Sequence, residues 1–256
     1  MTNGIFDSHA HYDDAAFDED RSALLDELPS KGVVCVVNCA SDMKSSLTSL
    51  ELAHKYGCIY AACGVHPHEA QGADENFITA LKELLKDERC VAIGEIGLDY
   101  HYDFSPREKQ IEVFEKQLAL AKETDMPVIV HDREAHEDTY NLLKKYRPKG
   151  VVHCFSGSAE SAKEIVKLGM YIGLGGAVTF KNAKKPCEVA ACVPGDRLLI
   201  ETDCPYMTPV PHRGTRNNSS YIPLTAQKLA EIRGVTAQEI IDMTRENAKR
   251  LFSINL

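Results

Sequence analysis

The sequence predicts an α/β protein with the (β/α)8, or TIM barrel, fold, on three observations. Its 256 residues match the usual size of such a barrel. Eight short apolar, β-branched segments recur along the chain, and stretches with helical spacing separate them. No glycine-rich dinucleotide or P-loop fingerprint supports the alternative, a doubly wound open sheet, because GLGG at 173–176 lacks the spacing.

The eight expected strands are short apolar runs bounded by polar or glycine-containing segments. In chain order they cover residues 5–11, 33–39, 59–66, 91–100, 128–131, 151–157, 170–176 and 198–203. No proline- or serine-rich linker divides them. We therefore expect a single domain over residues 1–256.

The expected helices are recognised by their capping residues and by a period of 3.6. The clearest spans 105–125, where Ser105 and Glu108 match a capping box with proline at the first helical position. A second capping box, Thr236 with Glu239, opens the last helix. The other expected helices cover residues 43–56, 75–86, 135–146 and 158–168.

The composition excludes several classes of protein. Hydrophobic residues make up 44% and charged residues 26%, which excludes a disordered or fibrous chain. The net charge of −9 argues against a protein that coats nucleic acid or an anionic membrane, although it leaves room for a locally positive site. No 18 apolar residues run together, so we expect no membrane span.

The nine cysteines and the N-terminus bear on the cellular compartment. Nine is an odd number and no CxxC pair occurs, which indicates reduced thiols rather than a disulfide framework. The N-terminus lacks the basic and apolar regions of a secretory signal. We expect a cytoplasmic protein and infer no obligate protein partner.

Polar residues interrupt the expected strands at their C-terminal ends, which form the active-site face of a barrel. His9 and His11 stand two residues apart, so both imidazoles share one face of the first strand. The same kind of interruption recurs at Glu95, His131, His153 and Asp203. Unpaired polar side chains in such places would cost a few kcal/mol if buried, whereas imidazoles and carboxylates together bind divalent metals. The sequence therefore predicts a metal centre at the mouth of the barrel.

The sequence resembles the TatD family of metal-dependent deoxyribonucleases, within the wider amidohydrolase-like group of barrels. The matching segments run nearly end to end: DSHAH (7–11), GVHPH (64–68), GEIGLDY (94–100), VIVHDREA (128–135), HCFSG (153–157), VTFKNAK (178–184), ETDCPYMTP (201–209) and RENAKRLF (245–252). The resemblance implies a barrel, two divalent metal ions, and hydrolysis of phosphodiester bonds in DNA in the manner of a 3'-5' exonuclease.

The resemblance also implies how the ligands divide between the two ions. One ion would be held by His9, His11, Glu95 and Asp203, and the other by His131 and His153, with Glu95 bridging. A carboxylate suits the bridge because its two oxygens can reach metals about 3.5–4 Å apart. Our hypothesis makes Glu95 and Asp203 the catalytic residues: the ions activate a water that attacks phosphorus, and Asp203 orients it or takes its proton. The ions could be Mg²⁺, Mn²⁺ or Zn²⁺, and histidine ligands suit the last two better.

Four further residues are expected to bind the substrate. His66 would contact a phosphate by the family's pattern. Lys181, Arg213 and Arg216 follow the seventh and eighth strands, where barrels often bind phosphate. The family has a stretch resembling RGKRNEPSY where this chain reads RGTRNNSSY (213–221), which puts substrate contacts and loop rigidity in question. With no Trp and no aromatic stripe, we expect no base-stacking platform for long single strands.

Two other functions fit the same barrel. An amidohydrolase-type enzyme would cleave a C–N or ester bond of a small molecule, but the fourth strand lacks the lysine that many such enzymes carboxylate as a metal bridge. A metal-stabilised binding protein without activity is the third, and the presence of every expected ligand argues against it.

Overall fold

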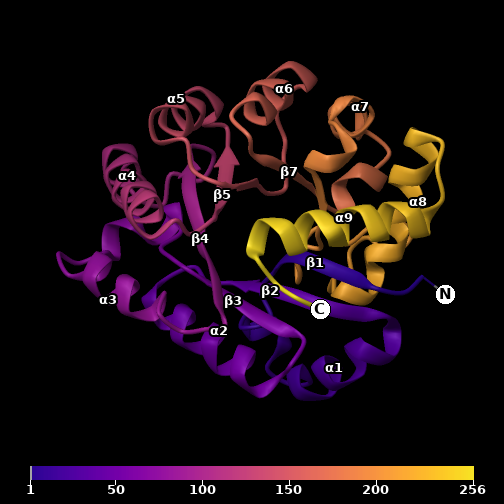
Figure 1. Ribbon diagram of the computed structural model, residues 1–256, viewed down its shortest axis with the longest axis horizontal. Coiled ribbons are helices and arrows are strands. Elements are labelled where there is room, and N and C mark those ends of the chain that lie inside the picture. The colour runs from indigo at the N-terminus through magenta and orange to yellow at the C-terminus, as the bar shows by residue number, and fades with distance from the viewer. Residues whose placement is uncertain (1) are drawn as a thin grey trace.

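The computed structural model describes residues 2–256, so Met1, the first residue of the predicted domain, lies outside the described residues. Eight parallel strands form one sheet whose spatial order is the chain order (Figure 1). The strands are β1 (Ile5–Ala10), β2 (Val33–Cys39), β3 (Ile59–Cys63), β4 (Cys90–Asp99), β5 (Val128–Arg133), β6 (Gly150–Val152), β7 (Tyr171–Leu174) and β8 (Leu198–Ile200). A bridge between Ala10 and Cys204 brings the segment after β8 against β1 and nearly closes the barrel. The predicted TIM barrel is confirmed.

Helices surround the strands (Figure 1). They are α1 (Arg21–Glu27), α2 (Met43–Lys55), α3 (Phe77–Leu84), α4 (Arg107–Thr124), α5 (His136–Tyr146), α6 (Ala159–Lys167), α7 (Lys184–Cys192), α8 (Ile222–Arg233) and α9 (Ala237–Phe252). The six expected helices correspond to α2, α3, α4, α5, α6 and α9, whereas α1, α7 and α8 were not expected. Two of these three give a weak periodic signal because they bury few apolar side chains: Leu25 in α1, and Val189 and Ala190 in α7.

One predicted helix cap is wrong. The α4 helix begins at Arg107, and its N-cap residue, Pro106, makes no side-chain capping bond. Ser105 is buried instead, where its Oγ donates to the His68 carbonyl at 2.8 Å and accepts from Gln71 N at 3.0 Å. The hydroxyl therefore ties the β4–α4 loop to the loop after β3. The cap of α9 by Thr236 and Glu239 is confirmed.

The barrel interior is filled by apolar side chains below the mouth. One core cluster is drawn from the strands and from the end of α9, including Val37, Ile129 and Leu199. Phe252 of α9 stacks on Phe6 of β1, with ring centroids 6.1 Å apart. The last turn of α9 therefore covers this end of the barrel, and the strands finish at the other end.

Two predictions from composition can be compared with the structure. All nine cysteines are free within residues 2–256, and five of them are buried. Over the same residues, no helix has the length and apolar character needed to cross a membrane.

Candidate metal centre

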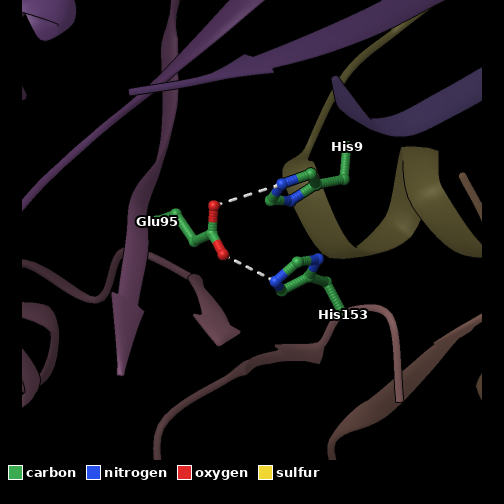
Figure 2. A group of neighbouring side chains, drawn as sticks. All are labelled: His9, Glu95 and His153. Carbon is green, nitrogen blue, oxygen red and sulfur yellow. Dashed lines mark ion pairs between the residues drawn. The ribbon is translucent and has the colours of Figure 1, made fainter. Parts of the chain in front are cut away.

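Side chains from β1, from β4 and from the turn after β6 meet at the mouth of the barrel. Figure 2 shows the Glu95 carboxylate directed between the rings of His9 and His153. Glu95 Oε2 lies 3.3 Å from His9 Nε2, and Oε1 lies 2.7 Å from His153 Nε2. All three residues are buried. The two imidazoles stack at 3.9 Å, so they approach the carboxylate side by side.

Four donor atoms gather on one side of this carboxylate. His9 Nε2 and His11 Nε2 are 2.9 Å apart, and Asp203 Oδ1 lies 3.7 and 3.5 Å from them. Glu95 Oε2 completes the group, 3.4 Å from His11 Nε2. Four ligands at the usual metal distance of about 2.0–2.2 Å form a tetrahedron with edges of roughly 3.3–3.6 Å. Three of the spacings fall in that range, the His9–Asp203 spacing is 0.1 Å longer, and the two imidazole nitrogens are closer together.

A second group forms around the other oxygen of Glu95. Oε1 lies 2.8 Å from His131 Nδ1, and His131 Nδ1 lies 3.4 Å from His153 Nε2. His66 Nε2 is 3.5 Å from the same oxygen. Thus each oxygen of Glu95 faces a separate group of nitrogens. His66, expected as a substrate contact, lies within reach of this second group.

Three of the ligating side chains come from just beyond the strands, not from within them. His11, His153 and Asp203 follow the last residues of β1, β6 and β8. Asp203 has a φ of 57°, in the left-handed region, and its N donates to His9 O at 3.0 Å. These three side chains join His9, Glu95 and His131, which reach the centre from within β1, β4 and β5.

Two of the imidazoles are oriented by acceptors behind them. His131 Nε2 lies 3.1 Å from Asp99 Oδ2, and His11 Nδ1 lies 2.8 Å from the Cys39 carbonyl. Because both acceptors take a proton from the ring, the opposite nitrogen keeps its lone pair for the centre. Asp99 is fully buried behind His131.

Two other buried carboxylates near the site accept hydrogen bonds from backbone N–H groups. Asp7 accepts hydrogen bonds from Thr202 N, Thr202 Oγ1 and Ser219 Oγ at 2.9, 2.6 and 2.7 Å, and so secures the segment that carries Asp203. Glu201 Oε1 accepts from Cys154 N at 2.5 Å. Burial raises the pKa of Asp7 to about 6 and that of Glu201 to about 8.

The charges of the centre are strongly coupled. Burial alone would raise the pKa of Glu95, but the charges of His153, His66 and His9 outweigh it and hold the pKa well below its usual range. Burial alone would likewise lower the pKa of His131, but hydrogen bonds to Asp99 and Glu95 raise it to about 9. Burial lowers the pKa of His9 to about 4, with the charge of His153 adding to the effect.

The donor set fits divalent metal ions. Within residues 2–256, no lysine or arginine nitrogen lies within 4.0 Å of the carboxylates of Glu95 or Asp203, and the neighbouring donors are imidazoles. Buried carboxylates need a compensating positive charge. In the metal-free protein the protonated imidazoles of His11 and His131 supply part of that charge. A divalent cation held by the neutral imidazoles and the two carboxylates would replace it.

The predicted substrate-binding residues do not converge on one point, in contrast to the expected metal ligands. Arg213 lies over the Phe180 ring, 3.7 Å from its centroid, and Lys181 follows Phe180 in the β7–α7 loop. Both are exposed. Arg216 instead pairs with Asp20 at 2.6 and 2.8 Å, so its guanidinium is already engaged.

The segment that departs from the family's pattern is well anchored. Asn217 is buried and donates to the carbonyls of Thr202 and Tyr206 at 2.9 and 2.7 Å. Asn218 accepts from Ser220 N at 3.0 Å, and Ser219 N donates to the Tyr12 hydroxyl at 2.9 Å. The asparagines and serines of RGTRNNSSY therefore make specific bonds that fix the loop after β8.

The family of this chain follows from its sequence as a whole. The family model described as TatD related DNase matches residues 6–253. The chain belongs to this family. As the resemblance implied, the protein is a metal-dependent hydrolase of the TatD type.

Individual relatives agree over nearly the full length. The chain is 46% identical over 254 residues to the "Uncharacterized metal-dependent hydrolase YabD" of Bacillus subtilis, covering 98% of this chain and 100% of the relative. It is 33% identical to the "3'-5' ssDNA/RNA exonuclease TatD" of Erwinia tasmaniensis, with 98% and 100% covered. The crystal structure of YJJV, a TatD homolog from Escherichia coli K12, superimposes with a TM-score of 0.92 at 34% identity and covers both chains fully.

Proposed function

We propose that this TatD-family protein is a deoxyribonuclease that removes nucleotides from DNA 3' ends by hydrolysing phosphodiester bonds at a two-metal centre. The observation that carries the proposal is the place of Glu95, whose two oxygens face two separate groups of imidazoles. Phosphodiester displacement uses two adjacent cations to stabilise the attacking and the leaving oxygen. The printed name of the Erwinia tasmaniensis relative, a 3'-5' ssDNA/RNA exonuclease, supports a nucleic-acid substrate and the direction.

The residues fall into two ligand sets in this proposal. His9, His11 and Asp203 would hold one ion, His131 and His153 the other, and Glu95 would bridge them. When bound, Mn²⁺, Zn²⁺ or Mg²⁺ would supply Lewis-acid stabilisation of the oxygens at phosphorus. The imidazole-rich donor set favours Mn²⁺ or Zn²⁺ over Mg²⁺.

Asp203 is the residue best placed to handle the proton of the attacking water. Burial would raise its pKa, but the hydrogen bond from His11 and the charge of His9 lower it, so the carboxylate is ionised at neutral pH. Its side chain is 15% exposed, more than that of Glu95, so water can reach it. An ionised, water-accessible carboxylate can accept a proton at Oδ2 while Oδ1 faces the imidazoles.

Substrate binding is assigned to the cations of the neighbouring loops. Lys181 and Arg213 are exposed beside Phe180 and can contact backbone phosphates. Arg216 can do so only by exchanging Asp20 for a phosphate. A cytoplasmic location rests on the unpaired cysteines.

The small-molecule alternative is not favoured. The β4 strand, Cys90–Asp99, contains no lysine, and Glu95 occupies the bridging place that a carboxylated lysine takes in many amidohydrolases. No second observation points to a C–N or ester substrate.

The deciding experiment compares substrates side by side. Protein loaded with Mg²⁺, Mn²⁺ or Zn²⁺ is incubated with end-labelled single- and double-stranded DNA and with a panel of dihydropyrimidines and lactones. We expect metal-dependent shortening from the 3' end that EDTA abolishes. Activity confined to the small molecules would refute the proposal. H54N, which alters an exposed histidine paired with Asp87, should behave as wild type on every substrate.

A further inference from the structure

The loop between β4 and α4 carries an exposed aromatic pair at the rim of the metal centre. Tyr102 and Phe104 stack with ring centroids 5.2 Å apart and planes 15° from parallel. Tyr102 is 47% exposed and Phe104 66% exposed. The sequence predicts no base-stacking platform for long single strands, because two aromatic residues in an irregular loop form no periodic stripe. The fold of the loop brings the rings together.

The loop that presents these rings is held firmly. His101 N and Tyr102 N both donate to Asp99 Oδ1, at 3.0 and 2.9 Å. Gln110 Nε2 donates to the carbonyls of Asp99 and Ser105 at 3.1 and 2.8 Å. The rings are therefore displayed on a fixed scaffold. Large apolar groups held in water at a site mouth are typical of a binding surface.

His68 connects the aromatic pair to the second ligand group. Its ring meets Phe104 and Tyr102 edge-on, at centroid distances of 4.8 and 5.5 Å. Its Nε2 lies 2.8 Å from Asp99 Oδ2, which also bonds His131. The rings of His68 and His131 are 6.1 Å apart. Only one imidazole thus separates the aromatic pair from a predicted metal ligand.

A cation completes the surface. Arg133, the last residue of β5, places its guanidinium carbon 4.7 Å from the Tyr102 ring centroid. Arg133 is exposed, and no carboxylate in residues 2–256 pairs with it within 4.0 Å. The guanidinium is therefore available to an incoming phosphate.

We propose that Tyr102 and Phe104 form a nucleobase subsite. An unpaired base stacks on the exposed face of Phe104 while Arg133 contacts the backbone phosphate of the same strand, next to the phosphodiester at the metal centre. Flat π-surface beside a free cation is the combination that binds single strands without sequence preference. Because a base in a duplex is already stacked and paired, the subsite selects single-stranded or frayed ends. This inference rests on the proposed nuclease function, and what it adds is the residues that contact the base, since single-stranded DNA already stands in the printed name of the Erwinia tasmaniensis relative.

The test compares F104L with the conservative F104Y on two strands that differ only in their bases and on a small diester that has none. The metal-loaded proteins act on a single-stranded oligonucleotide, on the same strand with abasic residues at its two 3'-terminal positions, and on bis(4-nitrophenyl) phosphate. We expect F104L to raise KM for the normal strand about tenfold, with kcat within about twofold, and F104Y to retain the wild-type KM. KM for the abasic strand and the small diester should not respond. L47A, which truncates an exposed leucine on α2, serves as the control.

A binding measurement without turnover accompanies the kinetics. EDTA-treated protein is titrated into an oligonucleotide that carries 2-aminopurine near its 3' end. We expect wild type, F104Y and L47A to quench the fluorescence by stacking, and F104L to lose the quenching.

The outcomes separate the two proposals. If wild type shortens DNA and F104L matches it in both KM and quenching, the subsite is refuted while the nuclease function stands. If the metal-loaded wild type cleaves no DNA, the nuclease function fails and the titration decides the subsite. Quenching that depends on Phe104 would then support it, and the absence of quenching would refute it.

Discussion

Oδ2 of Asp99 lies 3.1 Å from Nε2 of His131, so the buried carboxylate holds this imidazole from behind. The other ring nitrogen, Nδ1, faces Glu95 at 2.8 Å. An acceptor at Nε2 requires the proton there and leaves the Nδ1 lone pair for a metal. Asp99 thus sets the neutral tautomer that His131 would present to a metal beside Glu95.

The first prediction concerns D99N. If the NH2 group of the new amide faces His131 Nε2, it donates to that nitrogen and reverses the tautomer. If it faces the N–H groups of His101 and Tyr102 instead, their acceptor is lost and the loop is freed. We expect affinity at the second metal position to fall about 10- to 100-fold, while the first position is retained. Metal content after dialysis and chelator competition measure this. D103N, which alters an exposed partner of Arg107 in the same loop, is the control. Equal retention of both ions by D99N and wild type would contradict the prediction.

The second prediction concerns the bridge. In E95Q the side chain has one oxygen, and its NH2 group faces either His9 or the pair His131 and His153. We expect kcat/KM on DNA to fall at least about 100- to 1,000-fold and the metal content to drop below two ions per chain. E83Q, which changes an exposed glutamate paired with Lys86, should behave as wild type. Full metal-dependent activity in E95Q would disprove the bridging role.

The third prediction concerns Gly97 in β4. Its φ is 147°, and a Cβ atom there would lie 1.9 Å from the His131 carbonyl oxygen, so no larger residue fits without moving β5. We expect G97A to lower the free energy of unfolding by about 2–4 kcal/mol and to weaken metal binding through His131. Urea denaturation measures the first effect. G57A introduces its Cβ where nothing lies within 4 Å, and its change should stay within about 0.5 kcal/mol. Identical midpoints for the two variants would refute the steric argument.

The fourth prediction concerns pH. Burial would lower the pKa of His11, but its hydrogen bond with Asp203 and the charge of Glu95 raise it to about 10, and the pKa of His131 is raised to about 9. Both imidazoles are therefore protonated at pH 7 in the metal-free protein. Since metals bind the neutral form, loading at pH 7 should release protons, and Mn²⁺ affinity should rise from pH 6 to pH 8.5.

The same pKa values give the sign for stability. The pKa of His131 in the folded protein is above its unfolded value of about 6.5. Protonation of His131 therefore stabilises the metal-free protein at pH values below 6.5, and this contribution is lost as pH rises through about 9.

The proton release on metal binding is measured by calorimetry of Mn²⁺ binding in two buffers with different protonation enthalpies. A count of zero, or affinity that falls with pH, would contradict the prediction.

Much of the site could be predicted from strand ends. The spacing of His9 and His11 and the interruptions at Glu95 and His131 are local signals, and parallel strands bring their carboxyl ends to one edge. The sequence did not reveal the role of Asp99 behind His131 or of the pair Tyr102 and Phe104, because both depend on tertiary contacts. Ser105 illustrates the reason: its position matched a local capping rule, but a tertiary contact with His68 took its hydroxyl instead.

The sequence by itself determined the barrel, the order of its strands and the donor types at its mouth, because periodicity and strand ends are properties of neighbouring residues. The family resemblance implied a bridging Glu95, but only the tertiary structure set which oxygen faces which imidazoles and placed His66 near one group. It also decided that two exposed rings stand beside that centre. These relationships join residues far apart in the chain, and the closure of the barrel and the hydrogen bonds of its loops set their distances.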